Sequence, residues 1–553
     1  MANIWKNLGK SRLQELIGKE QLSRLEKLLP GLRKGNFDMN EMYSSDGLTK
    51  IFDAFFGYQK LLDSNFRREL FNTLPPEKID AALRALGIDS SKIGDFGKKA
   101  EQLPRRAWET REAAKNVGHV LEIPEDALPE DKKSFVLIQD LMVAERPYKP
   151  LKEYQMPVFT KAMEKLEPEL ARFIIQMPTG SGKTRTAIEI ITDYFKTYAE
   201  PGDIVLWLAH SEELCEQAMA SFLDIWPHVA TKPLKAIRFW GSEAKSLPHD
   251  FRESAFIVAG FPKLYSKVKA NDVALEEIKK RVSLIVVDEA HKVLAETYKA
   301  VTESFIHNRA RVIGLTATPG RSAHDQEENA ALAQFFFNNM VQIETASRET
   351  VLDYLRKKRV LSQTNYEPLV TKLDYKLSEK DKSHLEQFFD LPKDFLSKLG
   401  NDDIRNTEIV KKLEHEATNG KRIIFFACSL EQSQFVSALL RFMNVKAAHV
   451  DGTTPKAQRA GIIQQFKSGQ LSVLCNYEVL STGFDAPQTD VVFIARPTSS
   501  IVLYSQMIGR GLRGPAIGGT ETCKVIDVID NIQGFSDENK VYSYFENYYS
   551  NQV

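Results

Sequence analysis

The sequence predicts an α/β protein in which two tandem domains, each built on a doubly wound parallel sheet, follow an all-α N-terminal module. The chain has 553 residues, too many for one ordinary core at roughly 100–200 residues per domain. From about residue 146 onward, short β-branched apolar runs alternate with amphipathic segments, which is typical of buried parallel strands joined by helices. Before that point apolar residues recur three and four positions apart, which is typical of helices.

Residues 1–135 are predicted to form a helical accessory module, and residues 136–145 a linker. The segment LTKIFDAFFGYQKLLDSNFRRELFNTL has helical spacing and ends at Pro75-Pro76, and the acidic stretch EIPEDALPEDKK closes the module. Because few apolar contacts should cross such a boundary, we expect the rest of the chain to fold without the module. Its apolar face KIFDAFFGYQKLL either packs within the module or binds a protein partner, such as a nuclease or effector subunit.

Two α/β domains are predicted, over residues 146–344 and 345–553. The first contains four apolar runs that each end in polar turn residues: DIVLWLAH, AFIVAG, SLIVVDEAH and RVIGLTATPG. After a lysine-rich helical passage the pattern returns in KRIIFFACS, KAAHVDG, LSVLCNYEVL, DVVFIARP and CKVIDVID. Strand and helix alternate in both halves, so each half predicts one doubly wound sheet.

The composition limits the classes of function. Lys plus Arg equals Asp plus Glu at 74 each, so no global positive charge attracts nucleic acid, and a local groove would have to bind it. No apolar run reaches the roughly 18 residues of a membrane span, and the N-terminus lacks the pattern of a signal peptide, so we expect a cytoplasmic protein. The four dispersed cysteines have no spacing that predicts a zinc site.

The stretch MPTGSGKT, residues 177–184, predicts a phosphate-binding loop between a strand and a helix. Gly180 and Gly182 allow the backbone amides to turn toward a phosphate, Lys183 can reach the outer phosphates, and the Thr184 hydroxyl can bind Mg²⁺. The strict pattern requires glycine where this chain has Met177. The candidate cradle is Thr179, Gly180, Ser181, Gly182, Lys183 and Thr184.

A second signal lies about a hundred residues further on, where SLIVVDEAH ends an apolar run in two acids. At the carboxyl end of a buried strand beside a phosphate loop, Asp288 can hold Mg²⁺ and Glu289 can orient or deprotonate the attacking water. The alternative is an acid pair on the surface. The two signals together predict a catalytic nucleotide site.

Five motifs resemble those of superfamily 2 DEAD/DEAH-type helicases in order and spacing: MPTGSGKT, DEAH (288–291), TATPGR (316–321), STGFDAP (481–487) and QMIGRGLR (506–513). The segment VLSTGFDAPQTDVVFIARPTSSIVLYSQMIGRGLRG is similar to RadD-type bacterial DNA-repair ATPases and to the motor subunits of type I and III restriction enzymes. The resemblance covers residues 146–530. It implies two RecA-like domains that hydrolyse ATP with Mg²⁺.

The resemblance also implies roles for single residues of the first domain. Gln155 would pair with the adenine edge, which implies ATP rather than any triphosphate, although a surface glutamine is the alternative. His291 would couple the nucleotide to the second domain. Thr316 and Thr318 would relay between nucleotide and nucleic acid, or else form a simple turn.

The second domain is predicted to supply the arginines. Gln506, Arg510 and Arg513 lie three or four positions apart, so we expect them on one face of a helix, with the guanidinium groups acting on the γ-phosphate. Both arginines could instead be surface charges. By resemblance, Gly483 and Asp485 would approach the ribose and magnesium side of the cleft.

Nucleic-acid contacts are predicted at loops above both sheets, where hydroxyls, lysines and backbone amides can donate to phosphate. Each of these residues could equally cap the helix that follows it. The AGFPKL segment also departs from the Thr-Gln pair usual at that motif. The candidates are His210, Ser211, Gly260, Lys263, Ser429, Ser481 and Thr482.

These observations predict an ATP-driven helicase or translocase that acts on nucleic acid without reading base sequence. DNA is favoured over RNA, in repair, restriction or antiviral (phage) defence, because the resemblance is to DNA motors. One alternative is an ATP-gated sensor or scaffold that recruits a separate nuclease or effector. Another is a motor with its own nuclease, for which PEKID (76–80) offers acids and a lysine. Strand number, polarity, strand separation and oligomeric state stay open.

Overall fold

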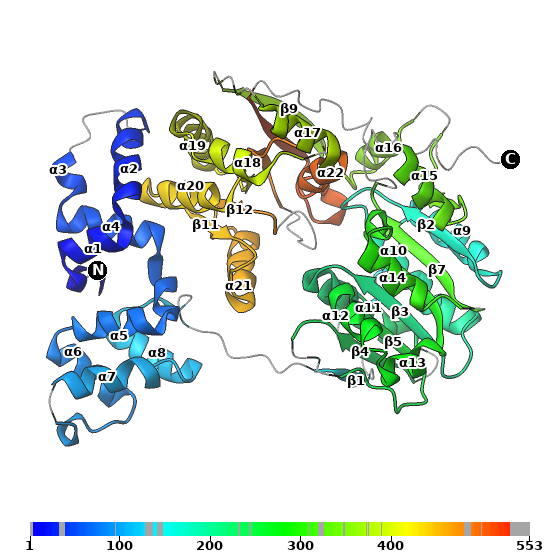
Figure 1. Cartoon of the computed structure of the whole chain (residues 1–553), viewed down its shortest axis with the longest axis horizontal. Helices are drawn as coiled ribbons and strands as arrows, with labels where there is room; N and C mark the ends of the chain where they lie inside the picture. The colour runs from blue at the N-terminus through cyan, green and yellow to red at the C-terminus, as the bar shows by residue number, and fades with distance from the viewer. Residues whose placement is uncertain are drawn as a thin grey trace.

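The protein is described from a computed structural model of the whole chain. The described residues are 4–32, 39–94, 96–125, 128, 136–140, 147–230, 233–242, 244, 246–307, 309–318, 326–346, 349–371, 373, 375, 377–388, 390–479, 488–498 and 500–530. Figure 1 shows the N-terminal helices on the left, the sheet domain that comes last in the sequence in the middle, and the sheet domain that comes first on the right. Among the described helices, none has both the length and the apolar character needed to cross a membrane.

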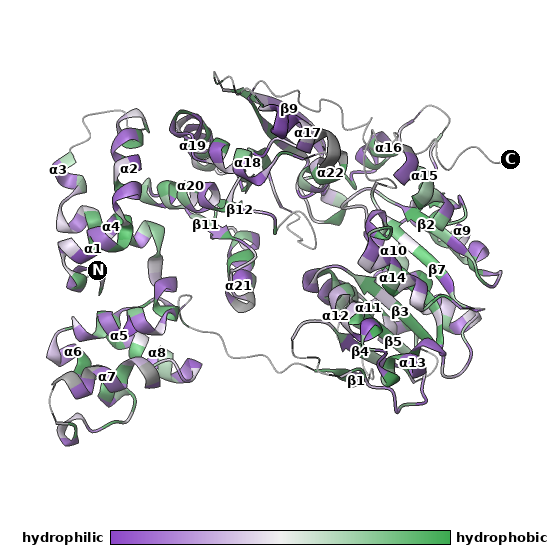
Figure 2. Cartoon of the chain, viewed as in Figure 1, coloured by the Kyte–Doolittle hydropathy of each residue, from purple (hydrophilic) through white to green (hydrophobic). Residues whose placement is uncertain are grey.

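The first domain contains an eight-stranded sheet in which one edge strand is antiparallel and all other pairings are parallel. Its strand order is β1 (Ile138–Asp140), β4 (Lys235–Phe239), β5 (Ala255–Gly260), β3 (Ile204–Ala209), β6 (Val282–Asp288), β7 (Arg311–Thr316), β2 (Arg172–Gln176) and β8 (Met340–Gln342). The central strands are buried along their length, and β3 and β7 are coloured as hydrophobic in Figure 2. A parallel sheet of this kind needs helices on both faces.

The helices of this domain are α9 (Met156–Leu166), α10 (Lys183–Thr197), α11 (Glu212–Val229), α12 (Phe261–Lys269), α13 (Val273–Lys279), α14 (Glu296–Ser304) and α15 (Gln326–Phe335). Strand β1 lies inside the expected linker, where it pairs with β4 through Ile138 and Ile237. Within the linker expected over 136–145, residues 138–140 thus form a strand of the first domain. Their backbone groups complete the sheet edge, which a solvated linker would leave open.

The second domain contains a six-stranded sheet with every pairing parallel. Its strand order is β11 (Ala447–Val450), β12 (Val473–Asn476), β10 (Ile423–Phe426), β13 (Val491–Ile494), β14 (Thr522–Ile529) and β9 (Gln363–Val370). Its helices are α16 (Val351–Lys357), α17 (Glu379–Phe388), α18 (Lys393–Gly400), α19 (Asp403–Thr418), α20 (Leu430–Phe442), α21 (Lys456–Lys467) and α22 (Ile501–Ile508). The predicted fold class, two tandem parallel-sheet α/β domains after a helical region, is confirmed.

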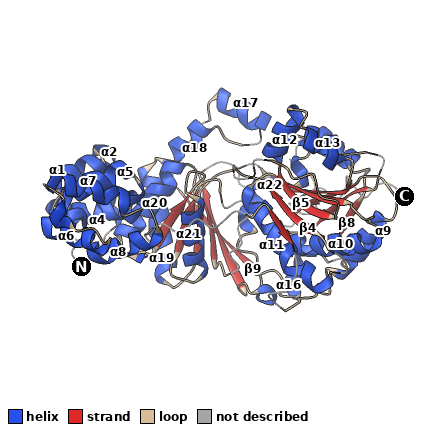
Figure 3. Ribbon diagram, turned by 90° about the horizontal axis from the view of Figure 1, so that it is seen from below, coloured by secondary structure: helices blue, strands red, loops and turns tan. Residues whose placement is uncertain are grey.

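The N-terminal region is helical. Its helices are α1 (Lys10–Ile17), α2 (Lys19–Leu32), α3 (Met39–Met42), α4 (Ser45–Phe55), α5 (Ser64–Asn72), α6 (Pro76–Ala85), α7 (Phe96–Arg106) and α8 (Arg111–Leu121). Figure 3 shows these helices beside the sheet of the second domain, on the side away from the first domain. The module therefore lies against the second α/β domain, although the first domain follows it directly in the sequence.

The module shares a hydrophobic core with the second domain. One continuous cluster joins buried side chains of α2 and α4 to those of α19, α20 and the sheet behind them. The rings of Phe55 and Phe435 lie 6.1 Å apart, and the half-buried Arg441 donates to the Asp53 carbonyl at 2.6 Å. The expectation that few apolar contacts join the module to the rest of the chain is wrong. The apolar face of KIFDAFFGYQKLL packs in part on another domain, which local periodicity could not reveal.

Candidate active site

The phosphate loop connects β2 to α10. Gly180 and Gly182 have φ angles of 85° and 86°, and Gly182 is the N-cap of α10, so the first amides of this helix face the space above the loop. Ser181 is held by a hydrogen bond from its Oγ to the Pro178 carbonyl at 2.7 Å. Met177, at the position where the strict pattern has glycine, is fully buried in the core of the first domain. The departure is therefore accommodated by packing.

The acid pair lies at the end of β6, directly opposite the loop lysine. Lys183 Nζ is 3.8 Å from Glu289 Oε1, and Glu289 adopts a left-handed backbone conformation with φ 52°. Burial raises the pKa of the Asp288 carboxyl above its usual range, and Lys183 opposes the shift only in part. Burial also opposes the charge on Glu289, yet the nearby charge of Lys183 holds the pKa of its carboxyl below its usual range. The pair is thus split into two carboxyls with different proton affinities.

Magnesium fits this arrangement. Thr184 and Asp288 line one cavity of about 240 Å³ together with the loop, and a hydroxyl and a carboxylate are oxygen ligands that Mg²⁺ takes beside substrate phosphates. The buried Asp288 carboxyl has only partial compensation from Lys183, so a cation at this point would stabilise its charged form. The assignment of both ligands stays a prediction.

His291 connects the acid pair to the end of β7. Its Nδ1 lies 3.3 Å from Glu289 Oε2 and 3.2 Å from Thr316 Oγ1. The Thr316 hydroxyl in turn donates to the Thr318 carbonyl at 2.9 Å. Burial lowers the pKa of His291 to about 3, so the ring is neutral at ordinary pH. A change at Glu289 can therefore reach the β7 loop through hydrogen-bonded side chains.

The second domain contributes three side chains to this site. Gln506 Nε2 donates to Glu289 Oε2 at 3.4 Å across the domain boundary. Arg510 and Arg513 line the 240 Å³ cavity with Lys183, Thr184, Asp288 and Glu289. An added Cβ on Gly509 would lie 2.5 Å from the Thr179 Cβ, which shows how closely the two domains approach. Residues more than 300 positions apart thus meet around one space.

The expected helical face is wrong for the two arginines. Helix α22 ends at Ile508, so Gln506 is helical whereas Arg510 and Arg513 lie on the loop that follows. This loop is held by the segment between α16 and β9 of the same domain. Ser362 N donates to the Leu512 carbonyl at 2.8 Å, and the Ser362 hydroxyl lies 2.7 Å from the Arg513 carbonyl. These tertiary hydrogen bonds fix the loop, and the spacing of the arginines could not predict them. Ser362 was not identified from the sequence, because a single serine outside a motif gives no indication of such a role.

Gln155 lies beneath the phosphate loop, with its side chain only 3% exposed. Its Nε2 donates to Thr186 Oγ1 at 3.0 Å and to the Gly182 carbonyl at 3.3 Å, while its Oε1 accepts from the Lys152 amide at 2.8 Å. The surface-glutamine alternative is therefore wrong. In this structure the amide braces the loop, and its pairing with adenine stays a prediction.

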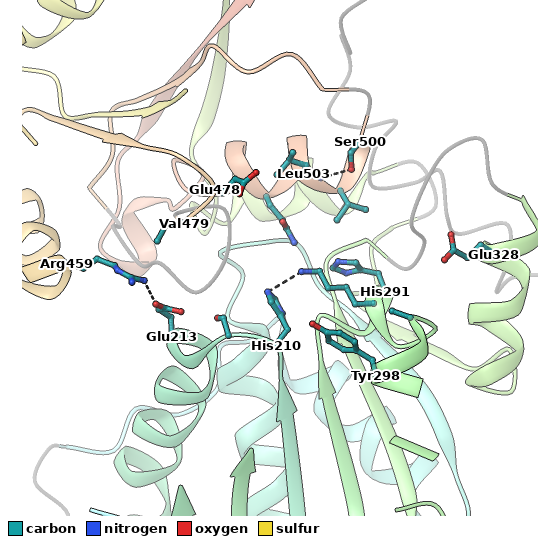
Figure 4. A pocket seen from close by; sticks show the side chains of 15 residues that line it. His210, Glu213, His291, Tyr298, Glu328, Arg459, Glu478, Val479, Ser500 and Leu503 are labelled. Carbon is teal, nitrogen blue, oxygen red and sulfur yellow. Dashed lines mark hydrogen bonds and ion pairs between the residues drawn. The ribbon is translucent and has the colours of Figure 1, made fainter. Parts of the chain in front are cut away.

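His210 and Ser211 line a second cavity of about 610 Å³ between the two domains, shown in Figure 4. Lys292 Nζ donates to His210 Nε2 at 3.2 Å, so the ring proton is on Nδ1, which is buried and has no partner among the described residues. Burial and the charge of Lys292 lower the pKa of His210 to about 4. Gln506 also lines this cavity and is hydrogen-bonded to Glu289, so the cavity adjoins the 240 Å³ cavity at the phosphate loop.

The other predicted nucleic-acid residues have local roles. Ser429 caps α20 by accepting from the Gln432 amide at 3.2 Å, and Ser211 caps α11 in the same way. Gly260 precedes α12, and Lys263 Nζ donates to the Gly241 carbonyl at 2.7 Å. Gly260, Lys263 and Ser429 do not line the cavity that contains His210. Four further candidates lie outside the described residues: Ser481, Thr482, Gly483 and Asp485.

The fold and the site define a class of protein. Residues 148–321 match the family described as type III restriction enzyme, res subunit, and residues 405–514 match the helicase conserved C-terminal domain. Together with two parallel-sheet domains that meet around a phosphate loop, these matches assign the chain to superfamily 2 of the helicases.

Individual relatives align with about two thirds of this chain. A 51.5 kDa protein of a Lactococcus phage is 28% identical over 362 residues, which cover 66% of each chain. The Saccharomyces cerevisiae protein IRC3, whose name describes an ATP-dependent helicase, is 27% identical over 71% of this chain and 54% of its own. The aligned chain thus spans about half to two thirds of these relatives.

Among solved structures, the type ISP restriction-modification enzyme LlaBIII bound to DNA aligns with a TM-score of 0.47 and 17% identity, over 72% of this chain and 29% of that one. A likeness this weak supports no statement about function.

Proposed function

We propose that this superfamily 2 protein hydrolyses ATP with Mg²⁺ and uses the cycle of domain closure to move along nucleic acid. The observation that carries the proposal is the shared cavity, in which Arg510 and Arg513 of the second domain face Lys183 and Glu289 of the first. Cations from an opposing domain act on the γ-phosphate only when the domains close, so closure and hydrolysis are coupled by geometry.

Each residue has a chemical task in this proposal. Lys183 binds the outer phosphates, and Glu289, charged because its pKa is held low, orients and deprotonates the attacking water. Arg510 and Arg513 stabilise the charge that develops on the transferring phosphoryl group. Bound Mg²⁺ would supply further neutralisation of phosphate charge. Gln506 donates a hydrogen bond to Glu289, so a change in the position or charge of this carboxylate reaches the second domain.

DNA is the proposed substrate, and binding is proposed to be independent of sequence. The match to a family named for restriction enzymes supports DNA, and the neighbouring 610 Å³ cavity between the domains supports a strand that crosses both. We propose a cytoplasmic role in repair, restriction or antiviral defence on the same resemblance. A nuclease or effector subunit is proposed as a partner, bound at the exposed surface of the N-terminal helices.

The experiment is steady-state ATP turnover of the full chain without nucleic acid and with single-stranded DNA, double-stranded DNA or RNA, each at saturation. We expect DNA to stimulate ATP turnover more strongly than RNA does. In Lys183→Ala we expect no stimulation by either nucleic acid. Displacement of a triplex-forming strand then separates translocation from simple ATP-gated binding. Stimulation without displacement would favour the sensor or scaffold alternative, and turnover indifferent to every nucleic acid would refute the proposal.

A further inference from the structure

One ion pair in the lining of the 610 Å³ cavity joins the two domains. Arg459, on α21 of the second domain, donates through one guanidinium nitrogen to the Glu213 carboxylate in the first turn of α11. Figure 4 shows the two side chains meeting from opposite walls. The Arg459 side chain is 13% exposed, whereas that of Glu213 is 39% exposed. The carboxylate is therefore the partner that can move into solvent at less cost.

The guanidinium of Arg459 is only partly used by this pair. Its second terminal nitrogen donates to the Thr454 carbonyl at 3.2 Å, and its Nε is buried with no partner among the described residues. A planar guanidinium presents five N–H donors, and a phosphate accepts two of them side by side. Arg459 thus has unused donor capacity inside the cavity that lies beside the nucleotide site.

The charges around the cavity do not favour a polyanion as they stand. Lys292 and Arg459 line it, but so do three carboxylates, Glu213, Glu328 and Glu478, and the chain as a whole has no net charge. Glu478 already lies 3.4 Å from Arg496 of its own domain. Glu213 is the carboxylate that pairs with Arg459, so its removal from the cavity would release that guanidinium.

We propose that Glu213 is an internal stand-in for a backbone phosphate: it holds Arg459 in the absence of nucleic acid and is displaced when a strand phosphate takes its place. This inference rests on the proposed function. One anion leaves the guanidinium as another arrives, so the charge of Arg459 stays compensated throughout. The exchange also places a strand contact on the second domain directly opposite His210 and Ser211 of the first.

The test is the affinity of the full chain for fluorescent single-stranded DNA, measured by anisotropy at several salt concentrations. Glu213→Gln removes the competing charge and should tighten binding about two- to fivefold, the range expected for a partly exposed ion pair. Arg459→Ala should weaken binding and reduce the salt slope by about 0.7, the loss of one phosphate contact. The opposite signs distinguish a displaced anion from a simple closing contact, whose loss would weaken binding in both variants.

Glu212→Gln is the matched control. It removes the same charge one position earlier, but the Glu212 carboxylate lies against Gly241, where an added Cβ would be 3.2 Å from Oε1. Its affinity should stay within about 1.5-fold of the parent, below the smallest effect expected of the pair. Glu213→Gln binding that is unchanged, weaker, or matched by Glu212→Gln would overturn the inference. Failure of the parent itself to bind any nucleic acid would instead refute the proposed function.

Discussion

The guanidinium carbon of Arg24 lies 3.9 Å from the ring centre of Phe435, so the second helix of the chain stacks on α20 of the last domain. Arg24 Nε also donates to Asp403 Oδ1 at 3.1 Å, and its side chain is 10% exposed. Both contacts join segments that are far apart in the sequence, 379 residues in the case of Arg24 and Asp403. They make the N-terminal helices a structural part of the second α/β domain.

Arg24→Ala should therefore destabilise the second domain together with the module, by about 2–4 kcal/mol. The change leaves Asp403 without its cationic partner and uncovers the Phe435 ring. Denaturant unfolding followed by circular dichroism measures the effect. Lys27→Ala, on the exposed side of the same helix, is the control and should change stability by less than about 0.5 kcal/mol. Equal effects of the two changes would contradict the docking.

A chain that lacks residues 1–135 should be poorly soluble or should unfold in a broader transition. Without the module, the apolar side of α19 and α20 that joins the shared core is exposed to water, and a large apolar surface favours aggregation. Size-exclusion chromatography and thermal unfolding against the full chain check this. Recovery of a soluble monomer with unchanged unfolding temperature would show that the shared core contributes little.

Lys183→Ala and Glu289→Gln should both reduce ATP turnover by about 10²-fold or more but should differ in nucleotide affinity. Lys183 is placed to contact the phosphates, so its loss should weaken binding of an ATP analogue; Glu289 acts on water, so the amide should retain the analogue. Lys183 also compensates Glu289 at 3.8 Å, so its loss should raise the pKa of that carboxyl. Equal losses of affinity in both variants would contradict these roles.

Arg510→Ala and Arg513→Ala should each leave binding of an ATP analogue largely intact while removing most DNA-stimulated turnover. An arginine supplied by the opposing domain stabilises the transition state far more than the bound ground state. Its loss lowers the rate by a factor of about 10³–10⁵ in comparable enzymes. Arg359→Ala is the control, since that exposed side chain pairs with Glu521 away from the cavity. An arginine variant that retains turnover within about threefold of the parent would leave the catalytic set.

Stability should fall as the pH is lowered from about 6.5 toward 4, in part through His210. Burial depresses the folded-state pKa of His210 to about 4, so the unfolded chain binds the proton first and is favoured as pH falls through this window. The contribution between pH 7 and 5 is at most about 2 kcal/mol. His210→Gln should flatten the pH dependence of the unfolding midpoint, whereas the exposed His249→Gln should not. Parallel curves for all three proteins would contradict the depressed pKa.

Much of the fold and of the candidate site could be predicted from short, local patterns in the sequence. Strand-length apolar runs followed by polar turns predicted both sheets, because a buried parallel strand must be apolar on both faces. The phosphate loop depends on glycines at fixed spacing, and Gly180 and Gly182 have the positive φ angles that spacing implied. The acids at the end of β6 follow from the same rule, since the carboxyl ends of parallel strands meet at one edge of the sheet.

Only the tertiary structure decided which distant segments meet. The spacing of Arg510 and Arg513 predicted a helix, but hydrogen bonds from Ser362, about 150 residues earlier in the chain, hold them on a loop. The apolar stripe of α4 predicted that this face is buried but not which element covers it. In the structure α20 packs against it. Periodicity records which face of an element avoids water, whereas the identity of the surface that covers it depends on shape and charge complementarity between segments far apart in sequence.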